Sequence, residues 1–250
     1  MENNNIIEIN NLTAKYGDDT VLDDITLSIK KGEIFVILGS SGGGKTTLLK
    51  HIIGLIEPAG GDISVFGKSI KGMGIEEFEN ILKKVGMLFQ GGALINSMKV
   101  WENVSMPLEQ HTSLDAETIA KIVKQKLSLV NLKNAYNLFP SELSGGMKKR
   151  VALARAIAMD PDILFFDEPS AGLDPITAHE LDRLILDLKK KMGITLVVVT
   201  HEVESIKRIA DRILYLQKGK NIFCGNLEEA KKEDIDEINK FFSWGTYSRS

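Results

Sequence analysis

Short apolar runs alternate with amphipathic segments through much of the chain. Three of these runs, at 34–38, 163–166 and 195–199, contain almost only apolar residues, as strands of a parallel sheet do when both faces are covered. Between the second and third runs, leucine and isoleucine recur at helical spacing over 181–188, and Gly193 is placed to end that helix. Buried strands that alternate with helices in this way predict an α/β fold with a parallel sheet.

Two other parts of the chain show the period-two alternation of strands that have one face in water. The alternation is clean over 25–29 and loose over 7–12, and a short apolar segment follows at 63–66. Near the C-terminus, the apolar segments 213–216 and 222–223 flank a Lys-Gly-Lys turn. These patterns predict N-terminal strands and a late hairpin.

From about residue 91 to 159 the pattern becomes helical. Asp115 is suited to cap a helix with one apolar side, formed by Ile119, Ile122, Val123, Leu127 and Val130. The tail from Glu228 predicts a short helix that contains Phe241, Phe242 and Trp244. Two interpretations of the tail stay open, namely packing on its own domain and docking on a partner subunit.

A glycine-rich segment joins the first buried run to the amphipathic segment 48–56, which predicts a helix stopped by Pro58. The glycine-rich segment itself reads Gly39-Ser40-Ser41-Gly42-Gly43-Gly44-Lys45-Thr46-Thr47. The spacing fits G-x-x-x-x-G-K-[ST], a phosphate-binding loop, in which backbone N–H groups surround a phosphate at the positive end of the following helix. Lys45 would reach the β- and γ-phosphates of the nucleotide, and the Thr46 hydroxyl would bind Mg²⁺. The alternative, a glycine-rich turn with a solvated lysine, is disfavoured by the strand-loop-helix context.

Composition and charge narrow the classes of function. The chain has 31 basic and 34 acidic side chains and a formal charge of −3, which argues against a protein that coats nucleic acid. Cys224 is the only cysteine, which excludes an internal disulfide and fits a reducing compartment such as the cytosol. We expect no secretory leader, and no apolar run approaches the 18 or so residues that span a bilayer. Action at a membrane would therefore need another chain.

Two carboxylates end the second buried run, in the segment Ile163-Leu164-Phe165-Phe166-Asp167-Glu168. In a protein with a phosphate-binding loop, a second strand of this kind brings an acid to Mg²⁺. Asp167 is suited to the metal, commonly through water, and Glu168 is suited to orient and deprotonate the attacking water. An isolated acidic pair after a strand would more often start a loop or cap a helix, so this interpretation depends on Lys45 and Thr46.

A further glycine motif, Leu143-Ser144-Gly145-Gly146-Met147, lies upstream of these acids. Ser144 can cap the following helix while the glycines expose backbone amides, which makes an anion-binding helix start. The order of phosphate loop, glutamine loop, LSGG, apolar-Asp-Glu and late histidine resembles that of the ATP-binding-cassette (ABC) ATPases over nearly the whole chain.

This resemblance implies a P-loop NTPase fold with a RecA-like parallel-sheet core, an N-terminal antiparallel β subdomain and an inserted α-helical subdomain. It divides the chain into an ABC ATPase domain over 1–226, with the helical subdomain at about 91–159, and a C-terminal helical tail over 227–250. The implied activity is hydrolysis of ATP with Mg²⁺.

The resemblance also implies roles for single residues. Tyr16, in Lys-Tyr-Gly, matches the aromatic residue that stacks on adenine. Gln90 matches the glutamine that senses Mg²⁺ and the attacking water and communicates with a membrane subunit. His201, after the third buried run, matches the switch histidine that contacts the γ-phosphate; as a lone residue it would more often be structural.

Other residues match positions that act between two copies of the chain. Ser144, Gly145 and Gly146 match the signature that binds the γ-phosphate held by the other copy, and Asp174 matches the loop that joins the two sites. Met147 departs from the glutamine common at its position, which leaves the phosphate contacts intact but removes the basis for a polar role of that side chain. The implied partner is a second copy in an ATP-sandwich homodimer.

A narrower resemblance is to the ATPase subunits of lipid transporters that work with MCE-domain proteins, the Mla (maintenance of lipid asymmetry) type. It is carried by Phe166–Thr177 and by a set of residues around and after Gln90: Leu88-Phe89-Gln90-Gly91-Gly92-Ala93-Leu94, Met98, Val100, Asn103-Val104, Pro107-Leu108 and His111-Thr112. Other importer ATPases, such as those for amino acids, share much of this phrasing. Ile95-Asn96 departs from the Phe-Asp pair that the type would place there.

The leading hypothesis is thus a cytosolic ATPase on the inner face of the cytoplasmic membrane that drives an integral membrane permease. Its further expected partners are MCE-domain and other envelope lipid-transport proteins, and we expect it to bind no nucleic acid. Candidates for the surface that receives the permease are Leu94, Met98, Val100 and Trp101, with packing inside the helical subdomain as the alternative. A non-transport ABC ATPase is disfavoured by the lack of a coiled-coil insertion and of a second cassette. A small-molecule kinase would leave the signature and His201 without a role.

Overall fold

The computed structural model describes residues 4–244, which fall into two compact units. The first unit combines the described residues up to Leu82 with those from Thr195 onward, and the second is Lys83–Ile194. Among the helices of the described part, none has both the length and the apolar composition needed to cross a membrane.

An antiparallel sheet opens the first unit. Its strands lie in the order β2-β1-β4-β5. The pairing of β1 with β2 shifts register between Ile9 and Leu12, where Asn11 adopts a left-handed φ of 51°. This bulge explains why the alternation over 7–12 is loose in the sequence. The predicted N-terminal strands are confirmed, with the bounds β1 Asn5–Tyr16, β2 Asp19–Lys30, β4 Gly60–Val65 and β5 Lys68–Ser69.

The first unit also holds β3 and three strands associated with it, β8, β9 and β10. Strand β3 pairs in parallel with β8 on one side and β9 on the other, and β10 pairs antiparallel with β9. Every residue of β3 and β8 is buried, as their continuous apolar sequences predict. The two buried runs and the late hairpin are confirmed, with the bounds β3 Ile34–Gly39, β8 Thr195–Val199, β9 Arg212–Gln217 and β10 Lys220–Gly225.

The helix after the glycine-rich segment ends earlier than predicted. It stops at Ile52, because Gly54 takes a left-handed φ of 69° and its N–H bonds the carbonyl of His51. Leu55 is 64% exposed beyond this end, although its apolar side chain extends the helical pattern. The helices of the first unit are α1 Lys45–Ile52, α2 Ile75–Leu82, α7 Val203–Ile209, α8 Leu227–Lys232 and α9 Asp236–Trp244.

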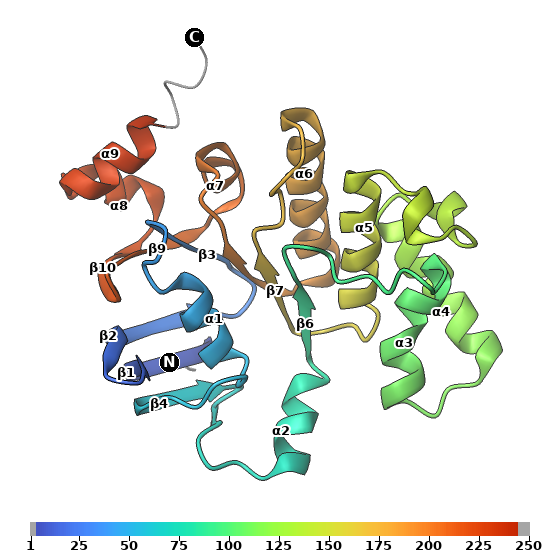
Figure 1. Cartoon of the computed structure of the whole chain (residues 1–250), viewed down its shortest axis with the longest axis horizontal. Helices are drawn as coiled ribbons and strands as arrows, with labels where there is room; N and C mark the ends of the chain where they lie inside the picture. The colour runs from blue at the N-terminus through green and yellow to red at the C-terminus, as the bar shows by residue number, and fades with distance from the viewer. Residues whose placement is uncertain (1–3, 245–250) are drawn as a thin grey trace. The chain divides into compact units, whose positions relative to one another are not determined.

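The C-terminal tail forms two short helices, α8 and α9, where the sequence predicts one (Figure 1). Asp234, between them, has a left-handed φ of 48°, which interrupts the helical backbone. The ring of Phe241 meets that of Tyr215 on β9 edge-on, with centroids 5.8 Å apart. At Phe241 the tail therefore packs on its own unit, whereas the Trp244 side chain lies outside the described part.

The second unit combines two parallel strands, β6 and β7, with a set of helices in which α3 packs on α4 and α5 (Figure 1). As predicted, Asp115 caps α4 by accepting a bond from the N–H of Thr118, and Gly193 ends α6 in the left-handed conformation. The elements are β6 Val85–Leu88, α3 Val100–His111, α4 Ala116–Leu129, the 3₁₀ turns η1 Lys133–Ala135 and η2 Pro140–Glu142, α5 Gly145–Ala156, β7 Ile163–Asp167 and α6 Pro175–Met192.

Candidate functional site

The phosphate loop in the first unit is shaped by glycines that no other residue could replace without strain. Gly39 has a φ of 143°, and a Cβ there would lie 1.9 Å from the carbonyl oxygen of Leu216 on the neighbouring strand β9. Gly42 and Gly44 have φ values of 74° and 100°. The loop can therefore turn from β3 into α1 within a few residues, with its backbone close to the sheet.

Lys45, the first residue of α1, folds back over this loop. Its Nζ donates to the carbonyl oxygens of Gly39 at 3.0 Å and Ser40 at 2.9 Å. The first turn of α1 contains no acidic residue, and its N-cap, Gly44, makes no side-chain cap bond. The backbone N–H groups of a helix start and an ammonium group thus lie close together in the chain, which is the composition of an anion site.

His201 lies at the same edge of the sheet as the phosphate loop. The strands β3 and β8 are parallel neighbours, and their register pairs Ile37 with Val199. Gly39 lies two residues after Ile37, and His201 lies two residues after Val199. His201 is exposed, and Tyr16, at the end of β1, is 50% exposed. Within the first unit the structure brings His201 beside the end of the strand that leads into the loop.

In the second unit the same geometry joins the glutamine loop, defined here as residues 90–93, to the two acids. The register of the parallel strands pairs Leu88 of β6 with Phe166 of β7. Gln90 and Glu168 each follow this pair by two residues and so leave the same sheet edge. Gln90 is exposed, whereas Asp167 and Glu168 are half-buried.

Lys149 of α5 reaches this edge, which the sequence pattern did not indicate. The side chain is only 7% exposed, and its Nζ donates to the carbonyl oxygen of Gln90. Burial lowers the pKa of Lys149, while the negative charges of Asp167 and Glu168 act in the opposite direction. The lysine lies three residues before the buried Ala152, but the charged residues on either side of it, Lys148 and Arg150, give this stretch the pattern of a solvated helix face.

The backbone at Glu168 is strained. Its φ of 47° is left-handed, a conformation that a glutamate rarely adopts and that costs about 1–3 kcal/mol. Strain of this size persists only where the surrounding structure enforces it. Ser170, two residues on, has a buried Oγ with no hydrogen-bond partner among the described residues.

The LSGG segment and Asp174 cap two helices that touch. Ser144 caps α5 by accepting a bond from the N–H of Met147 at 3.3 Å. Asp174 caps α6, accepting from the N–H groups of Ile176 and Thr177 and from the Thr177 hydroxyl, the last at 2.5 Å. These bonds, the Thr177 hydroxyl first, lower the pKa of Asp174. A Cβ on Gly146 would lie 2.6 Å from Cγ2 of Thr177, so the glycine permits this contact.

Met147, the departure from the expected glutamine, lines a cavity of about 510 Å³ together with Ala135 and Leu138. Asn131 and Lys133 stand at the same cavity. Met147 thus lies beside η1, at a cavity whose lining combines apolar and polar residues.

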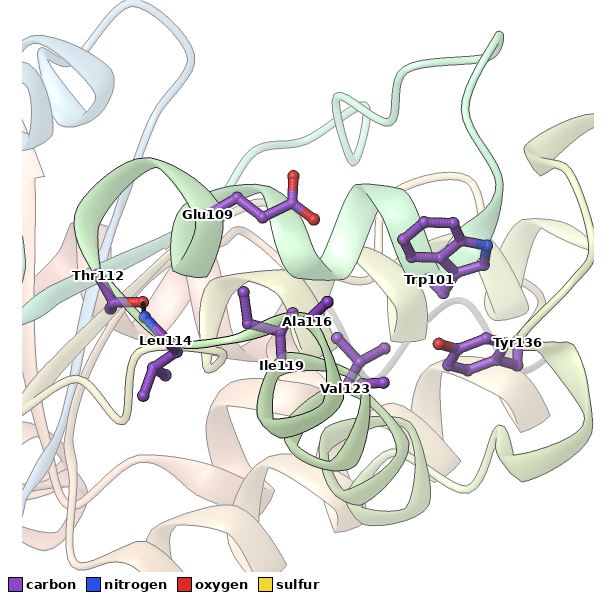
Figure 2. A pocket seen from close by; sticks show the side chains of 9 residues that line it. Trp101, Glu109, Thr112, Leu114, Ala116, Ile119, Val123 and Tyr136 are labelled. Carbon is purple, nitrogen blue, oxygen red and sulfur yellow. Dashed lines mark hydrogen bonds between the residues drawn. The ribbon is translucent and has the colours of Figure 1, made fainter.

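The four residues proposed to form the surface that receives a permease differ in burial. Val100 is fully buried and packs inside its own unit, whereas Leu94, Met98 and Trp101 are partly exposed. The Trp101 ring stacks on Tyr136 with centroids 6.1 Å apart, at one end of a cavity of about 310 Å³ between α3 and α4. Figure 2 shows this cavity, with Ile119 and Val123 of α4 beneath α3.

The sequence-predicted residues therefore fall into two groups. The phosphate loop, Tyr16 and His201 belong to the first unit, and Gln90, the LSGG segment, Asp167, Glu168 and Asp174 belong to the second. Among the described residues, no group of three or more His, Cys, Asp or Glu side chains is arranged to hold a metal ion.

Comparison with known proteins identifies the family of the chain. The family model described as "ABC transporter" matches residues 22–171. The Haemophilus influenzae "intermembrane phospholipid transport system ATP-binding protein MlaF" is 45% identical over 227 residues, covering 91% of this chain and 86% of that protein. The Mycobacterium leprae "probable ribonucleotide transport ATP-binding protein mkl" is 38% identical, covering 95% of this chain and 68% of that protein.

A solved structure confirms the fold class. The ATP-binding cassette MJ0796, in a dimeric post-hydrolysis state bound to ADP and Pi, superposes with a TM-score of 0.80 at 32% identity, covering 88% of this chain and 98% of that one. The family match spans the phosphate loop and the two acids, and together with these comparisons it identifies the family of the chain. The chain belongs to the ABC transporter family and is one of its ATP-binding, ATP-hydrolysing subunits.

Proposed function

We propose that this ATPase powers a permease that moves phospholipid or a related lipid across a cell envelope. The observation that carries the proposal is the 45% identity, over 91% of the chain, to an ATP-binding protein of an intermembrane phospholipid transport system. The chain would act from the cytoplasmic face of the inner membrane, held there by the permease, with MCE-domain proteins as further partners.

Binding of ATP is assigned to the first unit. The N–H groups of the phosphate loop and Lys45 hold the phosphates, and Tyr16 offers an exposed ring for the adenine. Lys45 would exchange its bonds to the carbonyls of Gly39 and Ser40 for bonds to phosphate oxygens. His201, at the same sheet edge, would contact the γ-phosphate.

Hydrolysis is assigned to the edge where β6 and β7 end. Glu168 accepts a proton from the attacking water, and Gln90, which leaves the same edge, helps to orient that water. Mg²⁺ prefers oxygen ligands. In the first unit the hydroxyl of Thr46 would offer one, and in the second unit the amide oxygen of Gln90 and the carboxylate of Asp167 would offer others. When bound, Mg²⁺ would neutralise phosphate charge.

Two copies would close around ATP. A relative of the same fold is dimeric with ADP and Pi, and the LSGG segment caps α5 with its amides at a helix start. We assign Ser144, Gly145 and Gly146 to the γ-phosphate bound by the other copy, and Asp174 to the contact between the copies. Closure and reopening then transmit the energy of hydrolysis to the permease.

The Glu168→Gln variant tests the site. It should bind ATP as the unmodified chain does in a fluorescent-nucleotide titration, but lose at least about 100-fold in turnover, because it removes the base and keeps the shape. Normal hydrolysis by this variant would refute the assignment.

Cargo is tested separately. The tagged chain, purified from membranes in mild detergent, should retain an integral membrane protein and bound phospholipid detectable by mass spectrometry. The reconstituted complex should move labelled phospholipid with ATP and fail to do so with Glu168→Gln. The second candidate cargo is a ribonucleotide, as the name of the 38%-identical relative indicates. ATP-driven uptake of labelled ribonucleotide without lipid movement would select it.

A further inference from the structure

Two cationic side chains of α5 hold the backbone of the glutamine loop. Lys149 donates to the carbonyl oxygen of Gln90, and the guanidinium of Arg155 donates to those of Gly92 and Ala93, each at 2.8 Å. Three of the four carbonyls in the loop are thus bonded to charged donors from one helix. Charged donors make hydrogen bonds about twice as strong as neutral ones.

The loop needs this support because its own backbone supplies little. Gly92 and Ala93 both have left-handed φ values, 73° and 48°, and the turn is closed by one bond from the Gly92 N–H to the Phe89 carbonyl. Gln90, Gly91 and Ala93 are exposed. A loop of this kind is among the least stable parts of a fold unless side chains tie it down.

Lys149 is buried, which is unusual for a charged side chain. Taking an ammonium group out of water is unfavourable unless bonds and opposite charges offset it. Here the Gln90 carbonyl and the charges of Asp167 and Glu168 do so. Its neighbour Lys148 is exposed on the same helix and serves as an internal comparison.

We propose that Lys149 is a positioning residue, whose ammonium group fixes the Gln90 backbone at the edge where Asp167 and Glu168 end β7, and so sets the orientation of the glutamine for hydrolysis. Arg155 anchors the far end of the same loop. The inference rests on the proposed catalytic roles of Gln90 and Glu168.

The bonds from Lys149 and Arg155 to the glutamine loop have a second effect, because α5, which carries both residues, begins at the Ser144 cap. One helix carries the signature segment at its start and bonds the glutamine loop along its side, so a displacement of this helix would move both. Contact of another copy with Ser144 would thus be transmitted to the position of Gln90.

The test uses the full chain with the variants Lys149→Met, Lys149→Gln and Lys149→Arg, and Lys148→Met as the matched control. Steady-state ATP hydrolysis gives kcat and KM, and hydrogen–deuterium exchange of a peptide covering 86–98 reports on the loop. Lys149→Met should lower kcat about 10- to 100-fold with KM changed less than about threefold, and should speed exchange in this peptide. Lys149→Arg should recover part of kcat, and Lys148→Met should change neither readout.

A kcat for Lys149→Met within about twofold of the Lys148→Met value would overturn the proposal, as would unchanged exchange over 86–98. If Lys149→Met does not fold, the same criteria for kcat and exchange apply to Lys149→Gln and Lys149→Arg. Of these two variants, Lys149→Gln is expected to have the lower kcat. Glu168→Gln is measured in parallel. Normal turnover by that variant overturns the catalytic site itself, whereas a defective Glu168→Gln with an unchanged loop in the Lys149 variants overturns the positioning role alone.

Discussion

Replacement of Asn103 should test how the segment that follows the glutamine loop is held. This side chain of α3 is fully buried. Its Oδ1 accepts from the N–H of Ile95 at 2.8 Å, and its Nδ2 donates to the carbonyls of Ile95, Met98 and Lys99, each at 3.1 Å. One amide group thus organises the turn that leads into α3.

The magnitude follows from which groups would lose their partners in Asn103→Leu. The Ile95 carbonyl also accepts from the Met98 N–H, and the Lys99 carbonyl also accepts from the Asn103 N–H, so both stay bonded. The Ile95 N–H loses the partner it has in Oδ1, at about 1–3 kcal/mol, and the lost bonds to the carbonyls, including the bond to Met98, add about 1 kcal/mol net. We expect the free energy of unfolding to fall by about 2–4 kcal/mol, or Tm by roughly 4–16 °C for a chain of this size.

Urea denaturation followed by circular dichroism measures this loss, with an unchanged slope as the sign that stability alone has altered. The control is Asn96→Ala, because Asn96 lies in the same segment and is exposed. A loss below about 0.5 kcal/mol, or one equal to that of the control, would refute the claim that the Asn103 amide holds this turn.

Three further predictions concern the phosphate loop, the signature and the cysteine. Lys45→Ala should weaken ATP binding at least about tenfold in a fluorescent-nucleotide titration, since it removes the charged donor at the loop; unchanged affinity would count against the site. Ser144→Ala in one copy of a mixed dimer should slow hydrolysis at the phosphate loop of the other copy, and kinetics with a purely local defect would contradict the shared site. Burial raises the pKa of the Cys224 thiol, against the opposing charge of Arg212, so less thiolate is present at any given pH. Iodoacetamide should therefore alkylate it more slowly at pH 8 than a free cysteine, with the inflection of the rate above the ordinary pKa; an equal rate would show that the thiol is not shielded.

Strands with continuous apolar sequences could be predicted from the sequence because burial on both faces leaves no polar position. The runs that became β3, β7 and β8 are of this kind. Helix ends were less accessible, since they depend on backbone conformation at one residue. The apolar Leu55 continues the helical pattern of α1, but the left-handed Gly54 ends the helix before it.

The motifs identified the phosphate loop and the two acids because their chemistry depends on residues close together in the sequence. The role of Lys149 could not be predicted in this way, since its partner Gln90 lies 59 residues away and the bond depends on how α5 packs. A lysine next to Lys148 and Arg150 has the pattern of a solvated helix face. Only the three-dimensional structure shows that one of these cations bonds the Gln90 carbonyl, at the edge where β6 and β7 end.

The left-handed backbone of Glu168 has a consequence for how the chain can evolve. Glycine or asparagine would adopt this φ more easily, so selection for a stable fold acts against the glutamate at this position. On the proposed role of Glu168 as the base, its presence is maintained by the need for turnover and not by folding. In a lineage that binds ATP but no longer requires hydrolysis, position 168 should be among the first to drift, and the drift should make the protein more stable.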